Sequence, residues 1–400
     1  MRILFLSRWF PEPPDNGSKM RITNVLKQLA VAHEISLVSF TDAGKTTESP
    51  WGDLGEYCAR VRTAPFHEYR PTSARALTGL FSIQPRSLVD TYSRDLAAAI
   101  SDEARRFCPD LVIASQLAMA PYVSILHGVP AILEEIELTV YRDEFRHAPT
   151  PRYRVRALLT WLKLQAYLKS ILPRFTACTV VSEGERRNLT SAVPGYRSVR
   201  VLPNAIDLAA YSGGYGPPEP NSLIYAGSVT YRANYDAVQH FLTNIYPRIS
   251  RGLAAPVVRI TGRHEGVDLS GLPRLPGVQF TGRVDDVRPL VARSWGAVVP
   301  LRVGGGSRLK ILESMALGTP VISTAKGAEG LEVRAGEDIL LADDPAEFAE
   351  RTDQLLQSIT LRQRLAEGGR QLVESKYNWD AVGRDLRSLV ETIPVRARIP

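Results

Sequence analysis

Short apolar runs rich in β-branched residues alternate with stretches of helical hydrophobic spacing along most of the chain. The first series of runs is RILFLS (2–7), EISLVSF (34–40), DLVIAS (110–115), PAILEE (130–135) and TACTVVS (176–182). The second series is LIYAGS (223–228), VVRITG (257–262), VQFTG (278–282), AVVPL (297–301) and PVIST (320–324). Strands that alternate with helices predict parallel sheets covered by helices on both faces, so we expect an α/β fold.

A cluster of Gly, Pro and Ser, AAYSGGYGPPEPNS, separates the two series. The length of 400 residues is too great for one hydrophobic core and suits two domains. We therefore predict an N-terminal domain over residues 1–208, a linker over 209–222 and a second α/β domain from 223 to 375. Ligands of such sheets bind at the carboxyl ends of the strands, and a site shared by two domains would lie in the cleft between them.

Composition narrows the choice of partners and compartment. The formal net charge of +7 fits an acidic small substrate or an anionic membrane surface, and the chain has no dense Lys/Arg run that would indicate nucleic acid. Three cysteines without a C-x-x-C pair indicate reduced thiols, and no apolar stretch reaches the length of a membrane span. We expect a cytoplasmic protein. The basic segment 152–175 has an apolar face, which either packs on its own domain or makes peripheral contact with the inner membrane face.

The segment PLRVGGGSRLKILESMALGTPVIST (300–324) predicts a strand, a glycine loop, a helix of about three turns and a second strand. Gly304, Gly305 and Gly306 can adopt positive φ and bring backbone N–H groups to an anion at the helix N-terminus. Glu313 follows roughly 8 Å along the axis, the reach from a diphosphate to its ribose. An ordinary flexible loop before a core helix is the alternative. Gly17 opens a similar turn and helix near the N-terminus, with the same two interpretations.

Six segments, taken in their order along the chain, resemble the family 4 glycosyltransferases. They are PPDNGSKMR (13–21), VVSEGERRNL (180–189), VLPNAID (201–207), YAGSVTYRANYDAV (225–238), FTGRVDDVRPL (280–290) and the glycine-loop segment. The resemblance implies a GT-B fold of two facing Rossmann-like domains with an interdomain cleft. It also implies a C-terminal helix within 376–400 that returns to the N-terminal domain. The implied activity is retaining transfer of a sugar from a nucleoside-diphosphate sugar to a hydroxyl acceptor, with no cofactor. Such acceptors include glycans, lipid-linked saccharides and natural products.

The resemblance assigns donor contacts to matching positions of this chain. Glu313 would bind the ribose, the loop would hold the diphosphate, and Gly17 would approach it from the other domain. Arg263 is predicted to point to the same site from a strand end, although an ordinary surface arginine is the alternative. The full predicted donor set is Glu313, Gly304, Gly305, Gly306, Ser307, Arg308, Gly17, Arg263, Arg283, Val284 and Gly227.

Several departures from the family pattern shape the predicted chemistry. Gly305 replaces a glutamate, Ser228 and Asn234 replace an arginine and a lysine, and Ile136 replaces a histidine. The absence of a D-x-D triplet argues against a metal. We therefore predict that Lys310 supplies the missing charge to the diphosphate, while Arg308 lies at the rim of the cleft.

The acidic strand end LEEIEL (133–138) supplies the other candidate catalytic groups, Glu135 and Glu137. A solvated or locally paired acidic turn is the alternative reading. The departures also leave open a catalytically silent GT-B protein that binds nucleotide sugars or serves as a partner subunit.

Overall fold

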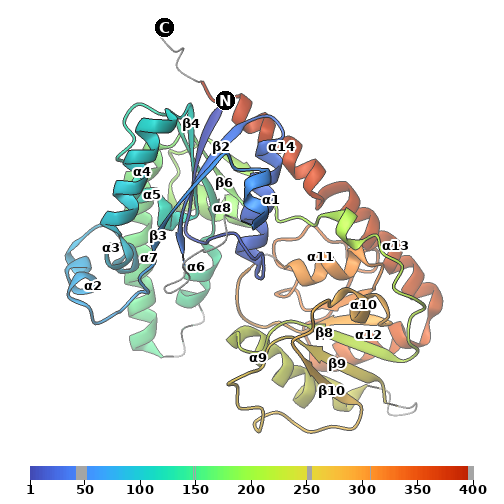
Figure 1. The fold of residues 1–400 in the computed structure, drawn as a ribbon. Helices are drawn as coiled ribbons and strands as arrows, with labels where there is room; N and C mark the ends of the chain where they lie inside the picture. Colours follow the sequence, from blue (N-terminus) through green and yellow to red (C-terminus); the bar gives the residue numbers. More distant parts are fainter. Residues whose placement is uncertain (42–51, 147, 149, 250–254, 307, 395–400) are drawn as a thin grey trace. The chain divides into compact units, whose positions relative to one another are not determined.

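The computed structural model describes residues 1–41, 52–146, 148, 150–249, 255–306 and 308–394 (Figure 1). The chain forms two compact units. The first holds residues 1–203 together with the chain from 383 onward, and the second holds residues 204–382.

The first unit is built on a seven-stranded sheet in the order β3-β2-β1-β4-β5-β6-β7, with every neighbouring pair parallel. Its strands are β1 Arg2–Ser7, β2 Glu34–Thr41, β3 Arg60–Pro65, β4 Leu111–Ser115, β5 Ala131–Ile136, β6 Ala177–Val180 and β7 Val199–Val201. β1 is central, and its residues 3–6 are fully buried because helices cover both faces of a parallel sheet.

Helices connect these strands and cover the sheet, with α1 and α4 on opposite sides of it (Figure 1). They are α1 Gly17–Ala30, α2 Ala74–Thr78, α3 Arg86–Thr91, α4 Arg94–Phe107, α5 Ala120–Val123, α6 Thr139–Arg146, α7 Pro151–Ile171 and α8 Glu183–Ala192. Asn16 caps α1 by accepting a hydrogen bond from the Lys19 N–H at 3.1 Å, so the predicted helix start at Gly17 is confirmed.

The second unit contains a six-stranded parallel sheet in the order β10-β9-β8-β11-β12-β13. Its strands are β8 Ser222–Ala226, β9 Val257–Thr261, β10 Val278–Gly282, β11 Gly296–Val299, β12 Val321–Ser323 and β13 Leu340–Leu341. Its helices are α9 Arg232–His240, α10 Arg288–Ala292, α11 Leu309–Ala316, α12 Pro345–Gln357 and α13 Ile359–Lys376. The predicted two-domain α/β architecture is confirmed.

The boundary between the units differs from the expected linker over 209–222. The division falls between Pro203 and Asn204, and residues 209–222 belong to the second unit. Polar contacts hold this segment there: the Tyr211 phenol donates to Glu313 at 2.9 Å, and Glu219 pairs with Arg259 and Arg293. A composition rich in Gly and Pro therefore marks an irregular segment rather than a free connection.

The last helix, α14 Trp379–Glu391, begins in the second unit and continues into the first. Its residues in the first unit pack on α1, where Arg387 Nη1 donates to Gln28 Oε1 at 2.5 Å. A side chain at Gly383 would collide with Gln28, so a glycine allows this close approach. No helix in the described part of the chain has an apolar stretch long enough to cross a membrane.

Candidate functional site

The second sheet reverses its strand order between β8 and β11. From β8 the chain proceeds to β9 and β10 on one side, whereas β11 leads to β12 and β13 on the other. Ligands of open parallel sheets bind beside the carboxyl ends of the strands at such a switch point. The loops that meet there are the turn containing Gly227, after β8, and the glycine loop 304–306, after β11.

The side chain of Lys310 reaches from α11 to β8 and α9, beside the turn that contains Gly227. It lies in the first turn of α11, and its Nζ donates to Asn234 Oδ1 at 2.9 Å and to the Tyr225 hydroxyl at 3.1 Å. The same ammonium stands 4.5 Å from the centre of the Tyr225 ring, a cation–π contact. A Cβ added to Gly227 would lie only 2.7 Å from Nζ, so the glycine leaves room for the amine at the end of β8.

The environment of Lys310 strongly disfavours its positive charge. Burial of the ammonium, reinforced by the nearby Arg308 and opposed by Glu313, lowers the pKa of Lys310 to about 7. An anion bound beside Nζ would restore the charged form, because an opposite charge within a few ångströms raises a lysine pKa. The Lys310 amine thus lies at the switch point, and among the described residues no carboxylate is bonded to it.

Glu313 follows Lys310 by one turn of α11. Its Oε1 accepts a hydrogen bond from the Tyr211 hydroxyl at 2.9 Å. Burial raises the pKa of Glu313, while the Tyr211 hydrogen bond and Lys310 act in the opposite direction. The carboxyl group is therefore held in place by a neutral phenol, and within the described residues no salt bridge occupies its oxygens.

Arg308 corrects one sequence expectation. It does not stand in the first turn of the helix: α11 begins at Leu309, and Arg308 precedes it in the left-handed conformation with φ 53°. The helix is therefore eight residues long rather than about three turns. The reason is that the chain must turn sharply out of the glycine loop, where Gly304 and Gly306 also take positive φ.

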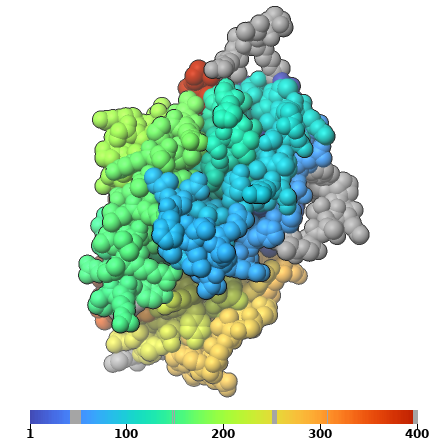
Figure 2. Space-filling model, turned by 90° about the vertical axis from the view of Figure 1, so that its left-hand side faces the viewer, coloured from blue at the N-terminus to red at the C-terminus, as the bar shows by residue number. Residues whose placement is uncertain are grey.

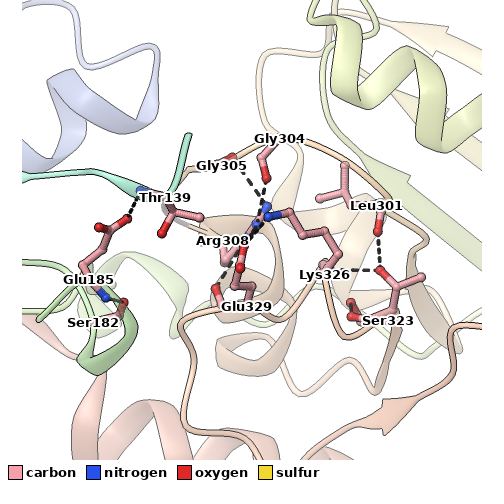
Figure 3. Close-up of polar contacts among 12 residues, drawn as sticks. Thr139, Ser182, Glu185, Leu301, Gly304, Gly305, Arg308, Ser323, Lys326 and Glu329 are labelled. Carbon is pink, nitrogen blue, oxygen red and sulfur yellow. Dashed lines mark hydrogen bonds and ion pairs between the residues drawn. The ribbon is translucent and has the colours of Figure 1, made fainter. Parts of the chain in front are cut away.

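The buried guanidinium of Arg308 points back at the glycine loop (Figure 3). It donates to the carbonyls of Gly304 at 3.2 Å and Gly305 at 3.5 Å, and to Glu329 Oε2 at 3.3 Å. Because these carbonyls turn toward Arg308, this side chain fixes the shape of the loop. Gly304 also packs closely on α9, since an added Cβ would lie 2.8 Å from that of Ala233.

The other predicted donor residues lie after β9, after β10 and in the first unit. Arg263 follows β9 and is exposed, and its carbonyl accepts from Ser228 Oγ at 2.9 Å. Arg283 and Val284 follow β10, the first exposed and the second half-buried. Gly17 is the first residue of α1 in the other unit, and Ser307 lies outside the described residues.

The first sheet has its own switch point, between β1 and β4. There the buried Arg21 of α1 donates to Glu134 Oε1 at 2.7 Å and to the carbonyl of Leu202 at 3.0 Å. The second oxygen of Glu134 accepts from Ser115 Oγ at 2.9 Å. Burial opposes the charge of Arg21, but Glu134 and Glu135 outweigh it and raise the arginine pKa. Glu134 is therefore a buried structural partner of a residue distant in sequence, rather than part of a solvated or locally paired turn.

Glu135 differs from its neighbour Glu134. Its Oε2 accepts from Gln116 Nε2 at 2.9 Å, and its Oε1 lies 3.7 Å from Arg21 Nε. Burial, reinforced by Glu134 and opposed by Arg21, raises the pKa of Glu135 to about 8. Glu135 and Gln116 both have left-handed φ values, 59° and 67°, which non-glycine residues rarely adopt outside functional sites. The sequence offered no signal for Gln116, nor for the pairing of Arg21 with Glu134.

Glu137 is half-buried just beyond β5. The backbone after it is fixed by Glu185, whose carboxylate accepts from the N–H groups of Leu138 at 2.8 Å and Thr139 at 3.0 Å (Figure 3). Ser182 caps α8 by accepting from the Glu185 N–H at 3.1 Å. The motif VVSEGERRNL thus serves to hold the turn that carries Glu137.

An aromatic hollow lies near the same edge of the first sheet, with about 230 Å³ of space that includes open solvent. Its walls include Phe40, Phe66 and Tyr92, and the Arg8 guanidinium stacks 4.3 Å from the centre of the Phe66 ring. Because Arg8 follows β1 and Phe66 follows β3, the hollow is at the carboxyl ends of the strands. Over the described residues, no group of three or more His, Cys, Asp or Glu side chains is arranged to hold a metal ion.

Comparison with known proteins agrees with this geometry. Residues 220–358 match the family model described as Glycosyl transferases group 1. The match spans the glycine loop, Lys310, Glu313 and the ends of β8 and β11.

One curated relative is a lipopolysaccharide core biosynthesis glycosyltransferase, LpsE of Rhizobium meliloti. It is 35% identical over 111 residues, which are 26% of this chain and 31% of that protein. The chain therefore matches about a third of the length of this relative.

Solved structures match nearly the whole chain. Sucrose-phosphate synthase from Thermosynechococcus elongatus has a TM-score of 0.70 at 17% identity, covering 98% of both chains. HepE of Anabaena, in complex with UDP, has a TM-score of 0.66 at 14% identity, covering 98% of this chain and all of HepE. The resemblance to glycosyltransferases, and the GT-B fold that it implied, are confirmed.

Proposed function

We propose that the protein is a retaining glycosyltransferase that moves a sugar from a nucleoside-diphosphate sugar to a hydroxyl acceptor. The observation that carries the proposal is the position of Lys310 Nζ, which bonds to Tyr225 of β8 and Asn234 of α9 beside the turn at Gly227, at the switch point. The family of residues 220–358 and the UDP complex of the structurally similar HepE support a nucleotide-sugar donor.

On the donor side, Lys310 faces the diphosphate and replaces the cations missing at Ser228 and Asn234. Charge grows on the diphosphate as the glycosidic bond breaks, and a preorganised cation at that point stabilises the transition state. Its partners in the described part of the chain are a phenol and an amide oxygen, so the ammonium gains its counter-charge from the ligand. Glu313 accepts the ribose hydroxyls, with Tyr211 fixing the carboxylate. Arg308 acts indirectly, by shaping the glycine loop.

On the acceptor side, we assign the reacting hydroxyl to Glu135 and Glu137 at the end of β5. A carboxyl group whose pKa is about 8 is largely protonated at neutral pH, so Glu135 can both donate and accept a hydrogen bond. A cytoplasmic enzyme acting on a saccharide acceptor, at the inner membrane face or in solution, fits these features.

The donor assignment is tested by nucleotide binding. UDP, GDP, ADP and TDP are titrated by calorimetry into the parent protein, Lys310→Ala and the control Lys376→Ala, which removes a surface lysine paired with Glu332. A hydrogen bond to a charged group contributes about 1.5 to 3 kcal/mol, so Lys310→Ala should weaken the preferred nucleotide about tenfold to a hundredfold. Lys376→Ala should leave the affinity unchanged.

Two results would contradict the proposal. Binding of none of the four nucleotides removes the donor site, and equal affinity of Lys310→Ala and parent removes the lysine from it. Turnover separates the enzyme from a silent nucleotide-sugar-binding protein. The corresponding nucleotide sugars should be hydrolysed slowly even without acceptor, whereas a silent protein binds them and releases no sugar.

A further inference from the structure

Two neighbouring segments of the first unit expose large apolar side chains to solvent. The first is the helical turn η2, Gly79–Phe81, with its flanking residues. Phe81 is 95% exposed and Leu80 is 55% exposed, and Leu77 and Ile83 are exposed beside them. An isolated exposed leucine needs no explanation, but a cluster that includes a fully exposed phenylalanine marks an interaction surface.

The second segment is the long helix α7. Its exposed residues Val155, Leu158, Leu159 and Leu162 follow the spacing of one helix face, and Val155 and Leu159 are 58% and 62% exposed. A different face of α7, which includes Leu164, is buried in the core of the unit. The helix is therefore apolar on two faces, although its fold uses only one.

The two segments form one continuous surface. Lys163 of α7 donates to the carbonyls of Gly79 and Leu80, which ties η2 to the helix. Figure 1 places α2 and α3 beside α7, and Figure 2 shows the blue segment around residue 80 against the green helix on one face. We call this surface the η2–α7 face; it consists of Leu77, Leu80, Phe81, Ile83, Tyr153, Val155, Leu158, Leu159 and Leu162.

The exposed turn is held in position by side-chain hydrogen bonds. Arg86 Nε donates to the carbonyl of Ala76 at 2.9 Å, and Arg75 Nη2 donates to that of Tyr92 at 2.6 Å. Asp90 accepts from the Arg70 N–H at 2.8 Å, which closes the base of the segment. The segment is therefore built to present Phe81 outward.

The positive charges around the η2–α7 face indicate an anionic partner. Helix α7 carries five Lys and Arg residues and no Asp or Glu, and Arg152, Arg154 and Arg156 are exposed around the apolar stripe. A second copy of this face would bring the same positive charges together, whereas an anionic bilayer complements them. Arginine stems can lie along the acyl boundary while their guanidinium groups contact lipid phosphates.

We propose that the η2–α7 face docks on an anionic lipid bilayer, with Phe81 and the α7 stripe inserted at the headgroup boundary. The docked unit is the one that carries Glu135 and the aromatic hollow, so the acceptor that fits is one anchored in that bilayer. This last step rests on the proposed function, whereas docking itself needs no donor and no acceptor.

The test is co-sedimentation of the full protein with sucrose-loaded vesicles. One set contains phosphatidylcholine alone and the other contains phosphatidylcholine with phosphatidylglycerol. The parent protein should pellet with the anionic set, and raising the salt concentration should release it. Phe81→Asp and Leu159→Asp should each weaken vesicle binding about tenfold or more. Each removes an apolar side chain that docking would bury in the bilayer, and each adds a negative charge that the anionic lipid repels. Arg154→Glu should act in the same direction.

Matched controls use residues outside the face. Val31→Asp changes another exposed aliphatic residue of the same unit, and Arg106→Glu reverses an exposed charge on α4; both should bind as the parent does. Absence of pelleting, equal binding to neutral vesicles, or equal losses in the controls would overturn the proposal. A concentration-dependent dimer lost in Phe81→Asp, without vesicle binding, would instead make this face a contact between copies.

Nucleotide binding by Phe81→Asp, measured in parallel, should match the parent, so failure of docking and failure of the donor site remain separate results.

Discussion

Burial of Lys310 destabilises the folded protein, and the same burial allows the amine to gain a proton when an anion binds. Its ammonium is placed beside a phenol, an amide oxygen and an aromatic ring, groups that solvate a charge only in part. A lysine with a pKa near 7 accepts a proton readily when a diphosphate arrives, so ligand binding and protonation are coupled. A lysine on the surface is charged whether or not a nucleotide is bound, so its charge would not change on binding.

We predict that Lys310→Met stabilises the protein and that the gain depends on pH. The folded pKa of about 7 lies below the unfolded value near 10.4, so the folded protein binds fewer protons between these pH values. The stability of the parent therefore rises with pH across that window, and the penalty of burying the charge is complete below pH 7. Thermal unfolding should show a gain for Lys310→Met that is about 5 °C or more larger at pH 6 than at pH 9. A gain independent of pH would mean that Lys310 titrates normally in the fold.

Glu134 and Glu135 are neighbours in sequence with separate predicted roles. Glu134→Gln leaves the buried Arg21 with a weaker partner, and breaking a buried ion pair is expected to cost about 3 kcal/mol in the free energy of unfolding.

Glu135→Gln removes a group that binds a proton more tightly in the folded than in the unfolded state, so it should relieve a loss of stability that the parent suffers as pH rises through about 8.

The corresponding measurements are urea unfolding at pH 6 and pH 9 together with transfer kinetics. Glu135→Gln should fold, gain stability relative to the parent at pH 9, and lose about a hundredfold in kcat, the scale of a general acid–base contribution. If Glu135→Gln transfers sugar at the parental rate, Glu135 is structural and the acceptor site must be sought elsewhere.

At the scale of elements, a glycine in the loop 304–306 can be required for its backbone conformation or for the space beside it. The sequence alone does not distinguish these two requirements. Three consecutive glycines indicate backbone freedom, but only the structure shows that Gly304 abuts Ala233 while the space beside Gly306 is open. Both have positive φ, 93° and 115°. Substitution by alanine therefore imposes backbone strain at both positions and a steric clash only at the first.

We predict that Gly304→Ala weakens nucleotide binding more than Gly306→Ala does. The strain common to both is of order 1 to 3 kcal/mol, so their stabilities should fall similarly, apart from the added clash. The clash would displace the loop from α9 and from Lys310, which should add about a tenfold loss of affinity at residue 304. Calorimetric titration of both variants with the preferred nucleotide measures the difference. Equal affinities would mean that the loop position does not define the site.

The elements that were predictable are those whose residues carry one clear pattern. β1 and β4 are mainly apolar and β2 and β5 are rich in apolar residues, because both faces of these strands are buried, and their positions followed directly from the sequence. β3, β7 and β13 were missed because they lie toward or at the edges of their sheets and are short or interrupted by arginine. The position of the glycine loop before its helix was predictable from local spacing, whereas the Arg21–Glu134 pair joins positions 113 residues apart and leaves no local pattern.

At the scale of the whole molecule, the two sheets follow one rule. In each, the strand order reverses once, and the reversal gathers polar side chains from loops that are distant in sequence. Topology therefore explains why the second unit collects Lys310 and Asn234 and the first collects Arg21, Gln116 and Glu135. Family resemblance identified the segments, but the choice of side chains that meet within each unit depended on packing that no spacing rule encodes.

The last prediction concerns the source of positive charge in the complete enzyme. A departing diphosphate needs a partner, and glycosyltransferases of the other main fold class supply it with a metal held by a D-x-D triplet, which this chain lacks. We propose that the charge instead comes from Lys310 and from backbone N–H groups at the start of α11. Sugar transfer should therefore stay within about twofold of its initial rate in excess EDTA, since removing a needed cation would cost about a hundredfold or more. The assay is release of nucleoside diphosphate in EDTA, with magnesium and manganese restored in parallel samples. Loss of activity in EDTA that either metal restores would show that the lysine is not sufficient and that the donor arrives as a metal complex.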